Sequence, residues 1–306
     1  MNIAFVKHYK IHYLFTGTLV VATIICLFVF GLNLGIDFLG GTIWEVEFSA
    51  PEGRDLASGG EVRPANSIIQ EKLNNFNLGE ITIQPTGERG VILRFKNIDE
   101  EVHQQMFNRL NEISKIEEKR FESIGPAIGK ELRKKTATLI IVSLVALLIY
   151  IAVAFRKLSW PISGWQYGLV SIITLAIDVL IPVLVLILLG KFHNIQLNIP
   201  IIAALLTILG YTMNDKVIVF DRVRENILRT RSEDFAGTIN QSLNQIIGRS
   251  LSTGFCTLLV LFALFFLGGE TLKYFSLTLI IGIIVGTYTS LFIASALLIS
   301  WSRLRK

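Results

Sequence analysis

Cysteine, histidine and charged side chains are all scarce in this chain of 306 residues. The two cysteines, Cys26 and Cys256, both lie inside apolar stretches, so they form no disulfide framework and are typical of small buried hydrophobic groups. Charged residues make up 17% of the chain, against about 25% in an ordinary globular domain. The net charge of +5 does not indicate nucleic-acid binding, because the basic residues stand at the edges of apolar stretches, where lipid headgroups and insertion signals explain them.

Motifs of catalysis are also missing. The segment 125–131 resembles a phosphate-binding loop, but it is one residue short between its glycines and has Glu131 in place of the magnesium-binding Ser or Thr. Histidines are scattered, and the pair His8 and His12 has no cysteine or carboxylate neighbour to complete a metal site. No nucleophile stands beside a base. We therefore expect no enzyme, no cofactor and no metal.

Apolar residues are abundant instead. They form 52% of the chain, and the mean hydropathy is +0.57. A bilayer core of ~30 Å is crossed by ~20 helical residues, and six stretches of at least that length carry few or no charges. They are Tyr13–Leu34, Thr136–Phe155, Ile162–Gly190, Leu197–Phe220, Ser250–Gly269 and Tyr274–Ser300. The sequence thus predicts a polytopic α-helical membrane protein with six transmembrane helices.

Lysine and arginine in short loops predict the orientation, because they resist translocation. They gather before the first stretch, between the second and third, between the fourth and fifth, and after the sixth. These residues are Lys7, Lys10, Arg156, Lys157, Arg222, Arg224, Arg229, Arg231, Arg303, Arg305 and Lys306. We expect this side, with both termini, to be cytoplasmic. A signal peptide at residues 1–34 is disfavoured, because the stretch exceeds an h-region of ~7–15 residues and no cleavage site follows.

The segment between the first two helices has the pattern of a soluble domain. Period-two alternation predicts a strand at 42–48, and helical spacing predicts helices at 64–76 and 99–113. Further strands are expected at 81–84, 91–95 and 119–124. The order βαββαβ is that of a ferredoxin-like fold with both helices on one face of the sheet. We expect three parts: residues 1–34 with the first helix, 35–132 as this extracytoplasmic domain, and 133–306 with the other five helices.

Two carboxylates lie within apolar stretches, where each costs about 2.5–3.5 kcal/mol against insertion. Asp215 either faces the protein interior as part of an ion path, or forms an interfacial pair with Lys216 that reaches the cytoplasmic headgroups. Asp178, near the middle of the third stretch, is either functional or a protonated structural hydrogen-bonding group. Arg249 opens the fifth stretch, where an arginine more commonly reaches the headgroups from the helix end; the alternative is a counter-charge for Asp215. Ionisable groups inside a helical bundle favour work driven by a proton or sodium gradient.

Small residues recur every four positions in the sixth stretch, at Gly282, Gly286, Ser290 and Ala294. Ser250 and Gly254 have the same spacing in the fifth. Such spacing lets helix backbones approach closely, so these faces are expected to pack on other helices.

Three motifs resemble those of the SecF family, the smaller membrane subunit of the SecD–SecF accessory of bacterial protein export. Residues 35–42, GIDFLGGT, resemble its G-[LI]-D-F-x-G-G-T. The segment 125–129, GPAIG, resembles its G-P-x-[VI]-G. Residues 210–226, GYTMNDKVIVFDRVREN, resemble its G-Y-S-[IL]-N-D-x-[VI]-V-V-x-D-R-[IV]-R-E-N. The resemblance covers essentially the whole chain.

The resemblance implies a half of a resistance–nodulation–division (RND) type transporter that uses the proton-motive force to help export preproteins across the bacterial inner membrane. The implied partners are SecD, the SecYEG channel with the SecA ATPase, YajC, the translocating preprotein and the lipid bilayer. It also implies that Asp215 and Arg249 lie on a proton path with an aspartate of SecD. Alternatives are a small-molecule exporter half and a scaffold or insertase factor without transport.

Two positions depart from the family pattern. Ile177 replaces a histidine that usually precedes Asp178, which puts a relay role for Asp178 in doubt, and Thr212 replaces the usual serine. Under the expected mechanism, protonation of Asp215 removes its attraction to Arg249, and the helices repack. The movement then reaches the outer domain through residues 35–42 and 125–129.

Overall fold

In the part of the chain that the structure describes, six helices are long and apolar enough to cross a membrane, which confirms the expected count. The structure is a computed structural model that describes residues 9–49, 64–87, 89–154, 163–230 and 234–304. The first five spans are α1 (Tyr9–Phe30), α5 (Pro126–Ala154), α6 (Gly164–His193), α7 (Ile199–Thr230) and α8 (Phe235–Leu267). The sixth consists of α9 (Glu270–Tyr288), the π-helical segment η3 (Thr289–Ala294) and α10 (Ser295–Leu304).

The helices end at positions other than the predicted ones where a backbone conformation or a capping side chain sets the end of the helix. Helix α1 stops at Phe30 because Gly31 adopts a left-handed φ of +70°. Helix α8 begins well before Ser250, since the Asp234 carboxylate accepts a hydrogen bond of 2.9 Å from the Gly237 amide and caps it. Some residues named above lie outside the described part of the chain: Lys7, His8, Phe155, Arg156, Lys157, Ile162, Arg231, Arg305 and Lys306.

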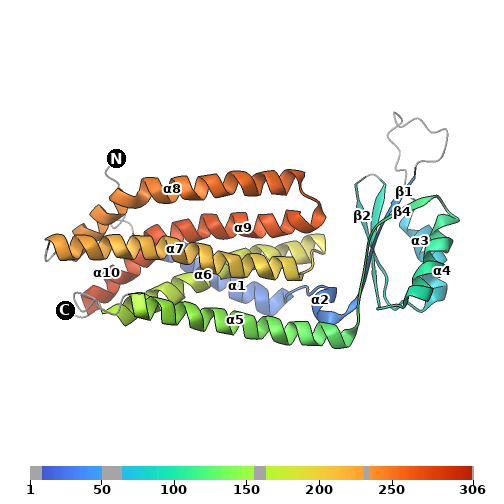
Figure 1. Ribbon diagram of the computed structural model, residues 1–306, viewed down its shortest axis with the longest axis horizontal. Helices are drawn as coiled ribbons and strands as arrows, with labels where there is room; N and C mark the ends of the chain where they lie inside the picture. Colours follow the sequence, from blue (N-terminus) through green and yellow to red (C-terminus); the bar gives the residue numbers. More distant parts are fainter. Residues whose placement is uncertain (1–8, 50–63, 88, 155–162, 231–233, 305–306) are drawn as a thin grey trace. The chain divides into compact units, whose positions relative to one another are not determined.

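The membrane helices form one compact unit together with residues up to Asn33. Within it α7, α8 and α9 lie alongside one another, and α1 runs beside α6 (Figure 1). A Cβ atom added at Gly282 would lie 2.1 Å from Ile208 Cδ1, and one at Gly286 would lie 2.0 Å from Thr212 Cγ2. The small residues of the sixth span therefore let α9 press against α7, as the spacing predicted. Large exposed apolar side chains on α1, α5 and α8 provide surface for lipid.

Residues Leu34–Thr136 form the second compact unit. Its strands are β1 (Gly41–Phe48), β2 (Thr82–Thr86), β3 (Gly90–Phe95) and β4 (Ile116–Ile124). All neighbouring strands are antiparallel, in the order β2-β3-β1-β4. Helices α3 (Asn66–Leu73) and α4 (Glu100–Asn111) cover one face of the sheet (Figure 1). This order and this single covered face confirm the ferredoxin-like arrangement.

Several boundaries in this unit were predicted wrongly. Helix α3 starts at Asn66 rather than Pro64, and it gives way to a 3₁₀ turn, η2 (Asn74–Phe76), which ends where Asn77 takes a left-handed φ of +46°. Asp99 occupies the N-cap position of α4 as expected, although its side chain makes no capping hydrogen bond. Strand β4 begins at Ile116, three residues before the predicted start at Lys119, because Phe48 at the end of β1 pairs with Ile116.

The two ends of the sheet domain are packed together through glycine. The segment that follows α1 contains the short helix α2 (Ile36–Leu39) and then Gly40, whose φ is +80°. A Cβ atom at Gly40 would lie 2.8 Å from Pro126 Cα, and one at Gly129 would lie 2.9 Å from the Gly40 nitrogen. No other residue fits at either position without moving backbone. The segments 35–42 and 125–129 therefore form a single glycine-packed junction at the entry and exit of the domain.

Candidate functional site

Asp178 and Lys216 form an ion pair between α6 and α7 with both side chains fully buried. The Lys216 ammonium donates to Asp178 Oδ2, and its next acceptor is the Thr212 carbonyl oxygen at 3.5 Å. The Thr289 hydroxyl on η3 donates to Asp178 Oδ1. Both oxygens of the Asp178 carboxylate therefore have a donor, which is how a buried charge is kept at tolerable cost.

Asp215 lies beside this pair on α7 and is only 4% exposed. Its Oδ2 atom accepts a hydrogen bond of 3.5 Å from the Thr287 hydroxyl of α9. Lys216 and Asp178 are both close enough to act on Asp215 electrostatically. Asp215 thus faces the protein interior, and the interpretation as an interfacial pair reaching the headgroups is wrong, since Lys216 is fully buried and turned to Asp178.

Gly286 and Thr289 of the sixth span lie close to Asp178 and Thr212, and together they complete the site on the side of α9 and η3. A Cβ atom at Gly286 would lie 3.7 Å from Asp178 Oδ2 and would collide with Thr212. The wider turns of η3 begin at Thr289, which contacts Asp178. The Gly286 carbonyl oxygen accepts a hydrogen bond of 2.6 Å from the Ser290 hydroxyl, and Thr289 Oγ1 lies 3.1 Å from the same oxygen. The π-helical turn, a feature common at functional sites, therefore points its first hydroxyl at the carboxylate of α6.

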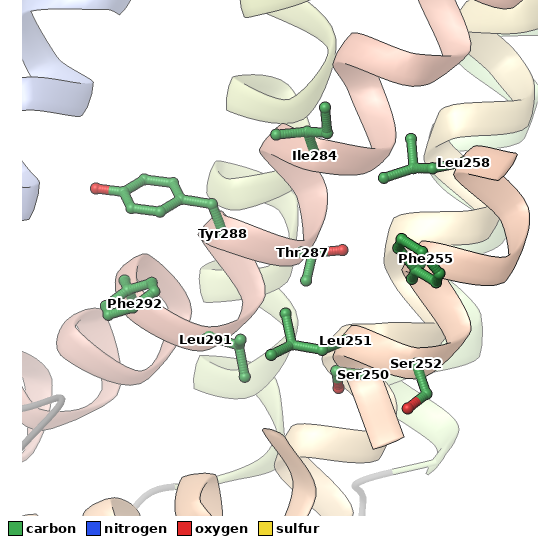
Figure 2. Close-up of a pocket in the computed structure, with 11 residues that line it drawn as sticks. Ser250, Leu251, Ser252, Phe255, Leu258, Ile284, Thr287, Tyr288, Leu291 and Phe292 are labelled. Atoms are coloured by element: carbon green, nitrogen blue, oxygen red, sulfur yellow. The ribbon is translucent and has the colours of Figure 1, made fainter. Parts of the chain in front are cut away.

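A cavity of about 580 Å³ lies between α8 and the sixth span, next to Asp215. Figure 2 shows Thr287 in its wall, with the hydroxyl turned toward the side of α8, and Ser250 and Ser252 at one end. Most of the lining is apolar, from residues such as Phe255, Leu258 and Ile284. Ser250 is 3% exposed, and within the described part of the chain its hydroxyl oxygen has no hydrogen-bond partner. One wall of the cavity thus carries the hydroxyl that reaches Asp215.

Arg249 is not brought to Asp215. Its side chain is exposed on α8, and among the described residues no ion pair involves it. The adjacent residue, Ser250, lines the cavity that contains Thr287. The positive charge next to the two carboxylates is instead that of Lys216. Sequence reasoning considered Lys216 only as the partner of Asp215 in an interfacial pair, although a lysine in an apolar helix is as costly as an aspartate and signals a buried partner in the same way.

The sheet domain contains a second group of polar side chains, in which Trp44 and His103 are buried and Glu118 is about one-third exposed. Glu118 Oε2 accepts hydrogen bonds of 2.7 Å from Trp44 Nε1 and is 2.7 Å from His103 Nε2. The His103 ring stacks on Phe121 at 3.7 Å between centroids. Over the described ranges, no three His, Cys, Asp or Glu side chains come together as a metal site. This group joins α4 to the sheet beside the domain core, to which Trp44 and Phe121 belong.

The intramembrane group can store one cation. With both carboxyls ionised, two negative charges face a single buried ammonium, so the site carries a net charge of −1. Binding one proton at Asp215 makes it neutral, which is the favourable state in a medium of low dielectric constant. Loading and unloading one cation is therefore what this arrangement can do.

Comparison with known proteins agrees with the motifs. Residues 102–304 match the family described as protein export membrane protein SecD/SecF, C-terminal, and residues 27–52 match the SecD/SecF GG motif. The chain is 39% identical over 295 residues to the protein translocase subunit SecF of Thermobaculum terrenum, covering 94% of this chain and 90% of that protein.

The chain belongs to the SecD/SecF family. Its glycine-packed junction contains the two motif glycines, Gly40 and Gly41, both with positive φ. The chain is also 35% identical to the protein translocase subunit SecDF of Thermus thermophilus, covering 96% of this chain and 38% of that protein. A crystal structure of SecDF from Thermus thermophilus, described as a translocon-associated membrane protein, superposes with a TM-score of 0.82 at 31% identity. It covers 99% of this chain, which spans 39% of the solved chain.

Proposed function

We propose that this SecD/SecF family member is the SecF subunit of a SecD–SecF complex that promotes preprotein export through the Sec translocon at the expense of the proton-motive force. The observation that carries the proposal is the buried group of Asp178, Asp215 and Lys216. A passive scaffold would have no reason to retain three ionisable side chains at a membrane depth where each is costly.

The proposed partners follow from the relatives. A SecDF chain joins a segment like this one to further sequence, so a separate SecD subunit would complete the same assembly here. SecYEG with SecA, YajC and the preprotein complete the proposed export machinery. The proposed location is the bacterial inner membrane, with both termini in the cytoplasm.

In the proposed cycle, Asp215 binds and releases the transported proton. Ionised Asp215 can only accept the Thr287 hydrogen bond, whereas protonated Asp215 can also donate to the Thr287 hydroxyl oxygen, so protonation allows the contact between α7 and α9 to change polarity. One proton crossing a potential of about 100 mV releases about 2.3 kcal/mol, enough to shift a two-state element about fifty-fold.

Arg249 and Asp178 have different parts in this proposal. Arg249 has an exposed side chain next to the cavity-lining Ser250, so its guanidinium is available to a carboxylate of the SecD subunit. Asp178 fixes Lys216 rather than relaying protons, because both its oxygens already accept hydrogen bonds. Movement of the helices reaches the outer domain through the glycine-packed junction, where residues 35–42 and 125–129 contact each other.

Replacing Asp215 with Asn tests the proposal. D215N preserves the shape of the side chain and cannot lose or gain the proton, so the gradient-dependent part of export should disappear while assembly with SecD persists. The matched control is D221N, which removes a carboxylate that is 69% exposed on the same helix and should leave export unchanged. Both variants would be compared in inverted membrane vesicles translocating a radiolabelled preprotein. Unaltered gradient dependence in an assembled D215N complex would exclude a motor role for this residue.

A further inference from the structure

Lys216 occupies the place that a metal cation would need at this site. Among the described residues it is the single lysine or arginine whose side chain is buried in the protein. Its ammonium contacts Asp178 Oδ2 and lies 3.5 Å from the Thr212 carbonyl oxygen. A carboxylate oxygen and a helix carbonyl oxygen are the kinds of ligand that hard cations such as Na⁺ take from a membrane helix.

We infer that Lys216 is the residue that makes this site specific for protons over sodium ions. The inference rests on the proposed function and deepens it, because it concerns which ion Asp215 carries. A proton and a sodium ion bring the same charge to the group, so charge alone does not separate them. They differ in ligand demand, since a proton binds one oxygen atom and a hard metal ion requires several.

With Lys216 in place, the oxygens on the Asp178 side of the site are already engaged in hydrogen bonds. Both oxygens of Asp178 already accept hydrogen bonds, one from the ammonium and one from the Thr289 hydroxyl. Within the described part of the chain, the hydrogen-bond partner of the Asp215 carboxylate is the Thr287 hydroxyl at 3.5 Å. A carboxylate with one hydroxyl beside it can be protonated, whereas it offers far fewer ligands than the six or so oxygens of a hard-cation site.

Removing the ammonium should open the site to sodium. In Lys216→Gln the Asp178 carboxylate loses its cation, and the net charge of the group falls from −1 to −2 with both carboxyls ionised. The position next to Asp178 Oδ2 and the Thr212 carbonyl oxygen is then vacant, and the new amide oxygen adds a ligand. Lys216→Arg is the matched control, because it retains the positive charge.

The test uses inverted vesicles whose only SecD–SecF complex contains this chain, with the export lost in D215N vesicles taken as the contribution of the complex. One set receives a proton gradient in potassium buffer without sodium. The other receives a sodium gradient in the presence of a protonophore. Wild type and K216R should respond to the proton gradient alone. K216Q should respond to sodium about tenfold more than wild type, equivalent to about 1.4 kcal/mol of ion-binding free energy.

Each outcome either supports or overturns the role of Lys216 in ion specificity. A wild-type complex driven by the sodium gradient would overturn the inference and leave the proposed function standing, whereas a complex driven by neither gradient would overturn both. An assembled K216Q complex as insensitive to sodium as wild type would also overturn the inference. Should K216Q fail to assemble, the double variant D178N/K216Q removes both buried charges together and still supplies amide oxygens. It should gain the sodium response, and a failure to do so would refute the assignment.

Discussion

Gly286 offers the sharpest test of how α9 is held against α7 beside the charged group. Replacement by Ala adds one carbon atom, which would lie 2.0 Å from Thr212 Cγ2 and 2.7 Å from Thr212 Cβ. Rotation about χ1 of Thr212 could move Cγ2 but not Cβ. The helices must therefore separate, and they must do so next to Asp178 and Asp215.

The expected cost follows from these distances. Overpacking of a filled interior costs up to about 3 kcal/mol, and replacement of a helical glycine by alanine returns about 1 kcal/mol. G286A should thus destabilise the protein by about 2 kcal/mol and lower gradient-driven export, because Thr287 moves with the backbone away from Asp215. Thr212→Ser removes Cγ2 alone, so in the G286A background it should restore part of the loss, with an interaction free energy of about 1 kcal/mol.

Unfolding by SDS in mixed micelles, measured for wild type, both single variants and the double variant, gives this interaction energy directly. The control is Gly210→Ala on α7, where nothing lies within 4 Å of the added atom. G210A should be neutral or slightly stabilising. Strictly additive effects of G286A and T212S, or equal losses in G286A and G210A, would refute the view that contact with Thr212 fixes the distance between the helices.

Three further expectations can be checked independently. Thr287→Val keeps the shape but removes the hydroxyl that donates to Asp215, so gradient-driven export should fall several-fold, consistent with about 1 kcal/mol for one hydrogen bond, while Thr207→Val, at an exposed hydroxyl on α7, leaves it unchanged in the same vesicle assay. Glu118→Ala removes the carboxylate that contacts Trp44 Nε1 and His103 Nε2 and should destabilise the sheet domain by about 1 kcal/mol in denaturant titration of the full chain, since Glu118 is one-third exposed and water can replace part of its hydrogen bonding; an effect no larger than that of Glu117→Ala, at a residue 69% exposed, would contradict this. Hydrogen bonds from Gln104 and then from His103 hold the pKa of Glu100 below its usual value, so this carboxylate stabilises the fold above the ordinary glutamate range and less as pH falls through the lowered pKa; Gln104→Ala should raise that pKa, which carboxyl-carbon NMR titration would detect.

Much of the architecture was predictable because it depends on local pattern. Six apolar stretches correspond to six long helices, and the alternation at 42–48 corresponds to β1. Helix ends were less predictable, since they depend on single backbone conformations such as the positive φ values of Gly31 and Asn77.

The charged group was predictable only in part. Asp178 and Asp215 stand out in apolar stretches, since burial of a carboxylate is costly wherever it occurs. Their relation to Lys216 depends on how α6 and α7 are rotated about their own axes, and this is decided by packing between segments far apart in sequence. The orientation of α8 in turn leaves Arg249 exposed, although its place at the start of the fifth stretch suggested a partner for Asp215.

The π-helical segment η3 has a mechanical consequence for the sixth span. An uninterrupted α-helix behaves as one rigid rod. A π-helical turn rotates the side chains that follow it about the helix axis, and it interrupts the regular hydrogen bonds that stiffen the helix. Helix α9 remains wedged against α7 by its glycines, and α10 lies past the wide turn with packing of its own. Strain arising at the buried charges can therefore be absorbed at Thr289–Ala294 before it reaches the terminal helix α10.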